Sequence, residues 1–254
     1  MNKKPTIMLL DGDVLVYKVG FAAEVNTNWG NGLHTWHAKV DEAAPAMGKI
    51  IEELRDNLRA DKIVVALTCH ETVNFRKQFW PAYKENRRNV RKPLLWKALR
   101  EYLVKKYDTR VKDFIEADDI LGILSTMPNT GQNRIIASID KDFKSIPGQY
   151  YNIKDKTLET ITEEVADYNF FKQCLTGDAV DNYPGLKGWG PVKAERHLEG
   201  VPMNQCWAAV VAAYEGAGLN EEHALAQARC ARILRFTDYD HTRKGPILWT
   251  PPKA

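Results

Sequence analysis

The chain has 254 residues with a net charge of +3, and 44% of them are hydrophobic, 27% charged and 10% aromatic. This composition is typical of a globular protein and excludes a collagenous, low-complexity or disordered chain. Because no apolar run approaches the ~20 residues of a membrane helix and the start of the chain lacks a signal peptide, we expect a cytoplasmic protein with no membrane partner.

Apolar runs at residues 6–10, 62–68 and 134–139 predict three strands. Helices are predicted between them, over residues 46–58, 93–106 and 116–125. Strands that alternate with helices indicate an α/β domain whose mainly parallel central sheet is flanked by helices. Ligands of such sheets bind beyond the carboxyl ends of the strands, where Asp11 and Asp140 follow their apolar runs.

The pattern changes after about residue 169. From there, predicted helices are interrupted by a glycine-rich segment, and only residues 247–249 suggest another strand. We therefore expect an α/β domain over residues 1–169 and a smaller helical C-terminal region over residues 170–254.

Positive charge is concentrated in residues 76–100. This segment holds nine Lys and Arg residues against Glu85 alone, a net charge of 9 − 1 = +8, so the rest of the chain carries −5. Residues 69–92 are too polar for a core, which favours a functional loop or a partly helical lid. Such a segment attracts polyanions, whereas acidic clusters elsewhere attract cations.

Carboxylates form four clusters in the sequence. These are Asp11 with Asp13, Glu116 with Asp118 and Asp119, Asp140 with Asp142, and Asp178 with Asp181. We expect the pairs at 116/119 and 178/181 to lie on helices, where a spacing of three places both on one face. Oxygen ligands without paired His or Cys favour Mg²⁺ or Mn²⁺ over zinc. One such pair is more often a helix cap, but four clusters together indicate two-metal phosphodiester chemistry.

The glycine-rich segment is a second candidate site. Gly185, Gly188 and Gly190 permit tight turns, and a helix is predicted over residues 191–199. The N–H groups at the start of such a helix can bind a phosphate, supplemented by Lys187 and Lys193. A simple turn between helices explains the segment about equally well by itself.

Five motifs resemble, in the same order, those of the 5′-3′ exonuclease and flap endonuclease family. They are LDGD at 10–13, FR at 75–76 with PAYKENR at 81–87, IEADD at 115–119, SIDKDF at 138–143, and TGDAVDNYPGLKGWGPVKA at 176–194. The resemblance covers about residues 6–200. It implies a PIN-like, flap-endonuclease-like fold with a helical arch at about residues 70–106 and a C-terminal helix-two-turn-helix motif that binds DNA. The short chain, with no attached polymerase, resembles the free-standing members encoded by bacteriophages.

The resemblance also implies metal ligands. A first ion would be held by Asp11, Glu116, Asp118 and Asp140, and a second would be served, directly or through water, by Asp119, Asp142, Asp178 and Asp181. In this family the helix-two-turn-helix often also holds K⁺ through main-chain carbonyls.

The remaining matched positions are expected to contact DNA. Lys84 and Arg87 match catalytic residues of the arch that contact the scissile phosphate, and Tyr83 lies where a base could stack. Further DNA contacts are expected from Arg76, Arg88, Gly185, Lys187, Gly188, Gly190 and Lys193.

The sequence thus predicts a monomeric, metal-dependent 5′-3′ exonuclease or flap endonuclease that cleaves DNA at a 5′ end, nick or flap, in phage DNA replication or degradation. A haloacid-dehalogenase-type phosphatase, with Asp11 as nucleophile and Asp13 as general acid, is an alternative that explains Asp13 better but leaves the basic segment unexplained. A non-catalytic DNA-binding module is the other alternative, and the retained acids argue against it.

Overall fold

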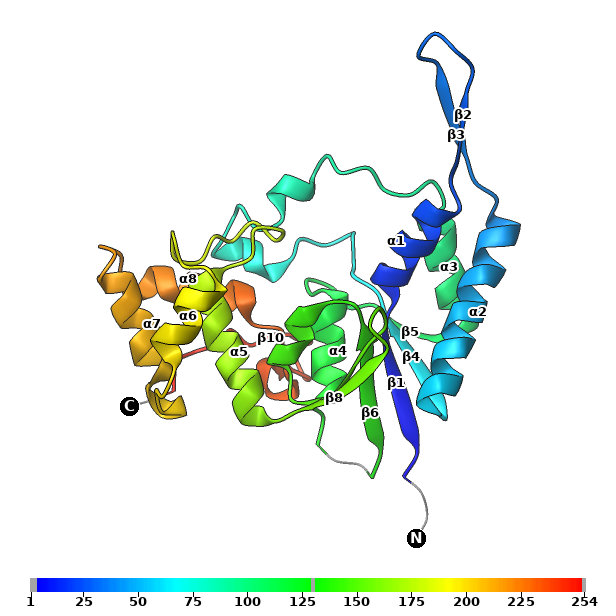
Figure 1. Ribbon diagram of the computed structural model, residues 1–254. Helices are drawn as coiled ribbons and strands as arrows, with labels where there is room; N and C mark the ends of the chain where they lie inside the picture. Colours follow the sequence, from blue (N-terminus) through cyan, green and yellow to red (C-terminus); the bar gives the residue numbers. More distant parts are fainter. Residues whose placement is uncertain (1–3, 129–130, 253–254) are drawn as a thin grey trace.

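The computed structural model describes residues 4–128 and 131–252 (Figure 1). Its centre is a six-stranded sheet in the order β5-β4-β1-β6-β7-β8. The strands are β1 (Thr6–Asp11), β4 (Lys62–Ala66), β5 (Asp108–Arg110), β6 (Asn133–Ser138), β7 (Gly148–Asn152) and β8 (Thr157–Ile161). All neighbours pair in parallel except β7 and β8, which confirms the expected mainly parallel sheet.

Helices cover both faces of this sheet. Side chains alternate along β1, so Met8 and Leu10 enter one core while Leu9 enters the other. Helices α1 (Gly12–Ala22), α2 (Val40–Leu58) and α3 (Trp96–Lys106) pack in the first core, and α4 (Ala117–Ser125) packs in the second. The chain therefore leaves β1 for β4 on one side and reaches β6 on the other, which creates a switch point beside β1.

The C-terminal region has a third core of its own. It is built by α5 (Glu163–Thr176), α6 (Pro191–Leu198), α7 (Cys206–Glu215) and α8 (Glu221–Ala231). The expected boundary at residue 169 falls inside α5, which contributes Ala166 to the second core and Phe170 to the third. After α8 the only ladder in the described chain is short, β9 (Tyr239–Asp240) with β10 (Gly245–Pro246), and the strand expected at 247–249 does not form.

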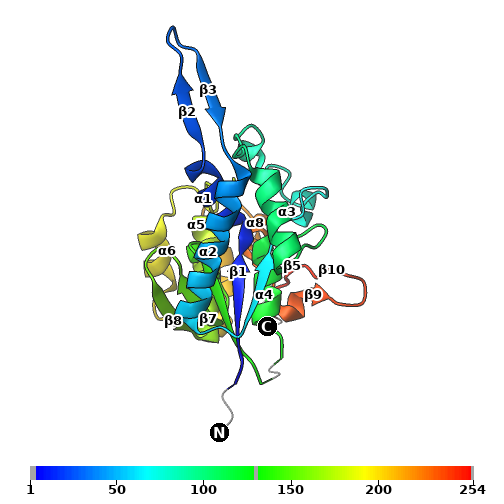
Figure 2. The ribbon, with the colours of Figure 1, turned by 90° about the vertical axis from the view of Figure 1, so that its right-hand side faces the viewer.

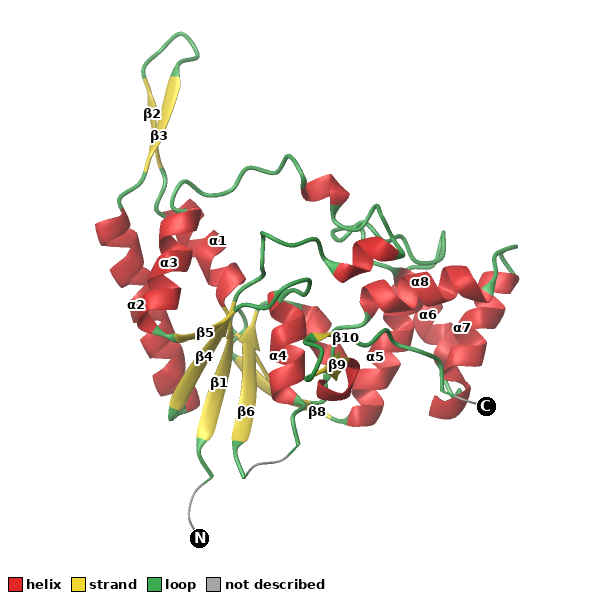
Figure 3. Ribbon diagram, turned by 180° about the vertical axis from the view of Figure 1, so that it is seen from behind, coloured by secondary structure: helices red, strands yellow, loops and turns green. Residues whose placement is uncertain are grey.

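Residues 67–95, which we call the strap, cross above the carboxyl ends of the strands (Figures 1 and 3). The strap holds only two short 3₁₀ turns, Phe75–Gln78 and Glu85–Arg87. The helical arch expected at residues 70–106 is therefore corrected. Its last part, α3, packs on α1 and α2 through Leu99 and Leu103, and the strap itself is mostly irregular.

A two-stranded hairpin projects from the same edge of the molecule as the strap (Figures 1 and 2). It consists of β2 (Val25–Asn28) and β3 (His34–His37), and the side chains of Trp29 and Trp36 on it are 66% and 50% exposed. At its base, the Arg91 guanidinium lies over the rings of Phe21 and Trp36. No helix in the described ranges is long and apolar enough to span a bilayer.

Candidate active site

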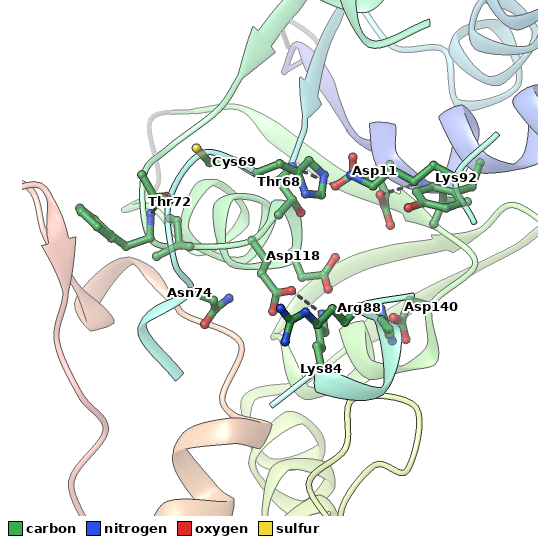
Figure 4. A pocket seen from close by; sticks show the side chains of 18 of the residues that line it. Asp11, Thr68, Cys69, Thr72, Asn74, Lys84, Arg88, Lys92, Asp118 and Asp140 are labelled. Carbon is green, nitrogen blue, oxygen red and sulfur yellow. Dashed lines mark hydrogen bonds and ion pairs between the residues drawn. The ribbon is translucent and has the colours of Figure 1, made fainter. Parts of the chain in front are cut away.

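Acidic side chains converge at the carboxyl ends of β1 and β6, beneath the strap. They line a cavity of about 1050 Å³ that includes Asp11, Glu116, Asp118 and Asp140. An adjoining cavity of about 240 Å³ is lined by Asp142, Asp178 and Asp181 and again by Asp118 and Asp140. Figure 4 shows Asp118 and Asp140 facing the larger cavity with Lys84 of the strap close by. Acids from four separate motifs thus share one site.

Asp11 is fixed by the junction between β1 and α1. Its carboxylate caps α1 by accepting from the Val14 N–H at 3.2 Å, and it also accepts from the Ser138 hydroxyl at 2.8 Å. Burial, together with the nearby charges of Asp13 and Asp140, raises the pKa of Asp11 to about 7. The site therefore holds this carboxylate in an environment that favours added positive charge.

Two further carboxylates show the same crowding. Burial and the charges of Asp140 and Asp178 raise the pKa of Asp142 to about 7. Burial and the charge of Asp11 raise the pKa of Asp118 well above its usual value. Asp140 lies between these groups, with its carboxylate accepting from the Asp142 N–H at 2.9 Å.

The strap supplies the opposite charge. The Lys84 ammonium donates to the Glu116 carboxylate and lies 3.3 Å from that of Asp181, which also accepts from the Arg87 guanidinium. Burial alone would raise the pKa of Glu116, but Lys84 and Arg76 outweigh it and lower that pKa to about 2. Lys84 and Arg87 therefore lie directly against the carboxylates of Glu116 and Asp181.

Two predicted site residues are instead part of the core. Arg76, expected to contact DNA, is 2% exposed, and its guanidinium forms a bidentate pair with Asp119 at 2.7 and 2.8 Å. Asp119, expected to serve the second metal, is fully buried and also accepts from the N–H groups of Glu116 and Leu234. Both predictions are wrong in this structure because these charges satisfy each other.

Tyr83 is also corrected. It was expected to stack on a base, but its ring is 2% exposed within the C-terminal core. Its hydroxyl donates to Glu116 at 2.7 Å and lies 3.1 Å from Asp181. Tyr83 therefore positions two carboxylates and presents no face for stacking.

Asp178 and Asp181 do not lie on a helix as expected. They belong to a turn after α5, closed by the paired backbones of Asp178 and Tyr183. The turn begins at Gly177 and ends near Gly185, both at positive φ, and a Cβ on either would come within about 2.3 Å of the other's backbone. This close approach still directs both acids to the smaller cavity.

In the rest of the glycine-rich segment, Gly185 packs against a buried side chain and the other predicted DNA contacts are exposed. The Gly185 N–H donates to the buried Gln227 side chain at 2.8 Å, so the expected DNA contact there is corrected to a packing role. The remaining predicted DNA contacts of this loop are exposed: Lys187, Gly188, Gly190 and Lys193. Gly190 caps α6, whose observed bounds, Pro191–Leu198, confirm the predicted helix to within one residue.

Asp13 holds the start of the strap through hydrogen bonds. Its carboxylate accepts from the Arg100 guanidinium at 2.6 Å and from the Thr68 N–H at 2.8 Å. A carboxylate committed to these partners is poorly suited to act as a general acid. This removes the main advantage of the phosphatase alternative.

Several residues that line the larger cavity were not predicted. They include Tyr17, Lys18, Phe21, Thr72, Asn74, Lys92 and Phe114. Figure 4 shows Thr72 and Asn74 at one end of the cavity and Lys92 at the other. No motif marked them, because each is an ordinary residue type and they come from separate segments of the chain, namely α1, the strap and the segment before α4. Arg88, a predicted DNA contact, is exposed and also lines this cavity.

The donor set fits a hard divalent cation by its chemistry. All are carboxylates, and the pKa values of Asp11, Asp118 and Asp142 are raised, which is the behaviour expected where cations are to neutralise gathered negative charge. Within the described residues, however, no group of three or more His, Cys, Asp or Glu side chains is arranged to hold a metal as it stands. In this arrangement Glu116 and Asp181 are instead paired with Lys84 and Arg87.

Comparisons with known proteins identify the family and the fold of this chain. A family model described as the 5′-3′ exonuclease, N-terminal resolvase-like domain, matches residues 6–172. The exonuclease of Escherichia phage T7 is 30% identical, and the exodeoxyribonuclease of Enterobacteria phage T3 is 29% identical, each aligned over 96% of this chain and 93% of the relative. The solved T5 D15 protein, co-crystallised with metal ions, has the same fold, with a TM-score of 0.62 at 15% identity over 88% of both chains. The chain therefore belongs to the 5′-3′ exonuclease family and is an exonuclease or flap endonuclease.

Proposed function

We propose that this protein hydrolyses DNA phosphodiester bonds at or near 5′ ends, nicks and flaps with two divalent cations, Mg²⁺ or Mn²⁺. The observation that carries the proposal is the convergence of Asp11, Asp118 and Asp140 beneath Lys84 and Arg87. A solved complex of the T5 D15 flap endonuclease that contains DNA and metal ions supports it. The relatives from phages T7 and T3 favour a role in phage DNA replication or degradation in the host cytoplasm.

Two groups of acids would hold the ions. Asp11, Glu116, Asp118 and Asp140 line the larger cavity, and Asp142, Asp178 and Asp181 complete the smaller one. When bound, such ions activate a water molecule and stabilise the oxygen that leaves. Asp119 is excluded from this set because it is buried against Arg76.

The chain's own cations would place the phosphate. Lys84 and Arg87 are held in the strap, and the Lys84 N–H donates to the Asp181 carbonyl at 2.8 Å, which ties the strap to the acidic turn. A phosphate bound over the acids would accept hydrogen bonds from both side chains. Their positive charges would then offset the negative charge of the phosphate during cleavage.

A cleavage assay with end-labelled DNA tests the proposed function. Blunt duplex, nicked duplex, 5′-flap, hybrid and single-stranded substrates are incubated with Mg²⁺, with Mn²⁺ and with EDTA. We expect metal-dependent release of nucleotides or flaps from 5′ ends. Binding without cleavage would support the non-catalytic module, and hydrolysis of a small phosphomonoester through a phosphorylated Asp11 would support the phosphatase.

Lys84 and Lys193 should differ in what they contribute. We expect Lys84→Ala to slow the chemical step by ~10²-fold or more, because its ammonium faces the reacting phosphate. Lys193→Ala on the exposed end of α6 should mainly weaken binding and reduce the salt dependence of log K by about one unit. Single-turnover rates and binding titrations at several salt concentrations measure both. If the two variants behave alike, the division into chemical and anchoring cations is wrong.

Metal binding should stabilise the protein most at neutral pH. The pKa values of Asp11 and Asp142 are about 7 in the folded protein, against 3.8 ordinarily, so folding takes up protons between about pH 4 and pH 7. Stability without metal therefore falls as the pH rises through this window. A cation replaces those protons, and at a hundred times its Kd it restores about 2.7 kcal/mol.

Thermal unfolding measures this coupling. The midpoint with Mg²⁺ minus that with EDTA should be larger at about pH 7.5 than at about pH 5, where protons compete for the same carboxylates. An equal shift at both values would show that the ion binds away from Asp11 and Asp142.

A further inference from the structure

Phe114 combines an unfavourable backbone conformation with an exposed ring at the edge of the larger cavity. Its φ is +67°, in the left-handed region that bulky residues rarely adopt. Its side chain is 49% exposed and lines the cavity, so burial of the ring does not offset the cost of this conformation.

The turn at this position explains the positive φ of Phe114 but not the presence of an aromatic side chain. The Phe114 N–H donates to the Thr72 hydroxyl at 2.8 Å, and its carbonyl accepts from the Phe75 N–H at 2.9 Å. After this turn, Ile115 enters the core and Glu116 lines the cavity. A glycine or asparagine would satisfy the same turn with less strain, so the fold does not require an aromatic side chain here.

Two residues with a strained backbone line this cavity. Non-glycine residues with positive φ in the described chain mostly occupy hairpin tips and helix ends, such as Asn31, Arg59 and Lys244. The two that line the larger cavity are Phe114 and Lys84, and Lys84 is the ammonium that contacts the acids. Strain that persists at a site is often part of what the site does.

The position of Phe114 relative to the acids defines what its ring can reach. Figure 4 shows Thr72 and Asn74 at one end of the cavity and Lys92 at the other, with Asp118 between them. Phe114 belongs to the first of these ends, because its N–H is hydrogen-bonded to the Thr72 hydroxyl. Only Ile115 separates Phe114 from Glu116 in the chain, so their Cα atoms are at most about 7 Å apart. A DNA strand whose phosphate lies over the carboxylates therefore brings a nearby base to the ring.

We propose that Phe114 is a specificity-determining residue that stacks on a base of the DNA strand next to the cleaved bond. The inference rests on the proposed nuclease function. Every base has a flat aromatic face, so the contact would distinguish a nucleotide that has a base from an abasic one without reading the sequence.

Abasic substrates and three variants test the contact. A single abasic nucleotide is stepped through the positions on both sides of the cleaved bond of a 5′-flap substrate, and kcat/KM is measured with Mg²⁺. For the wild type we expect one position at which the missing base lowers kcat/KM roughly 5- to 100-fold. Phe114→Gly should show the same loss on intact DNA and no further loss at that position.

The other variants separate stacking from strain. Phe114→Tyr should retain the wild-type values, whereas Phe114→Leu keeps the strained backbone and apolar volume but should behave like Phe114→Gly. Because glycine relieves the strain, the thermal midpoint of Phe114→Gly should equal or exceed that of the wild type. A drop of several degrees would show that the ring serves the fold and would overturn the proposal.

The two proposals fail in different ways. If the wild type cleaves DNA and neither the Phe114 variants nor the abasic positions change kcat/KM, stacking is refuted while the nuclease stands. If the wild type cleaves nothing, the proposed function fails, and the same comparison of Kd values in EDTA by fluorescence anisotropy still decides whether Phe114 contacts a base.

Discussion

The Asp140→Asn variant is expected to lose cleavage while it continues to bind DNA. Asp140 lines both cavities and lies between the crowded carboxylates of Asp11 and Asp142. Loss of its charge should weaken metal binding and slow single-turnover cleavage by roughly 10³-fold or more, equivalent to about 4 kcal/mol.

The fold should survive this change. The Asp140 carboxylate accepts from the Asp142 N–H, and the amide oxygen of Asn can accept the same hydrogen bond. Removing one of several crowded negative charges should also lower the pKa values of Asp11 and Asp142, so metal-free stability should stay equal or rise.

Cleavage rates with Mg²⁺, Kd values in EDTA and thermal midpoints together test the variant. Asp41→Asn is a matched control, because Asp41 is an exposed carboxylate in the first turn of α2, far along the chain from the acidic motifs. The control should match the wild type in all three measurements. An equal loss of binding and cleavage in Asp140→Asn, with a lower midpoint, would mean that Asp140 shapes the fold instead.

The positions of Asp11 and Asp140 could be predicted because they depend on local pattern and simple topology. Each follows an apolar run that forms a central strand, and β1 pairs in parallel with β6, so Leu10 lies opposite Ala137. Parallel neighbours end at the same edge of a sheet, which brings both acids together without any knowledge of side-chain contacts.

The role of Asp119 could not be predicted in this way. Asp118 and Asp119 are adjacent and chemically identical, yet Asp118 lines both cavities while Asp119 is buried. What separates them is the helical rotation of about 100° per residue and the location of Arg76, which comes from the strap. A motif gives residue types and spacing, but it does not show which carboxylate meets the buried guanidinium.

Elements with little apolar pattern were also missed. The β2–β3 hairpin is built mostly of polar and aromatic residues, and most of its side chains are exposed. Strands β7 and β8 mix Gly, Gln, Thr and Glu with few apolar residues. Their pairing is decided by turn geometry and by the neighbouring strand, so the periodicity of one strand alone does not reveal them.

Breaking the buried pair between Arg76 and Asp119 should have the largest effect on stability. We expect Arg76→Met to lower the free energy of unfolding by about 3–5 kcal/mol, because a fully buried carboxylate would lose its charged partner. Arg76 also donates to the carbonyls of Cys230 and Arg232, so the change disconnects the strap from the end of α8.

Denaturant unfolding monitored by circular dichroism measures the loss. Arg55→Met is the control, since Arg55 forms a 2.7 Å pair with Glu52 on the surface of α2 and is 43% exposed. An exposed pair of this kind contributes at most about 1 kcal/mol. A similar small effect for Arg76→Met would contradict the buried network.

The double variant Arg76→Met with Asp119→Leu distinguishes charge burial from lost volume. Removing both charges should recover part of the stability lost in Arg76→Met, although the N–H groups of Glu116 and Leu234 then lose their acceptor. DNA binding by the folded Arg76→Met protein completes the test, with Kd measured below its unfolding midpoint. An unchanged Kd agrees with Arg76 as a structural residue, whereas weaker DNA binding at wild-type stability would restore the direct DNA contact that the sequence predicts.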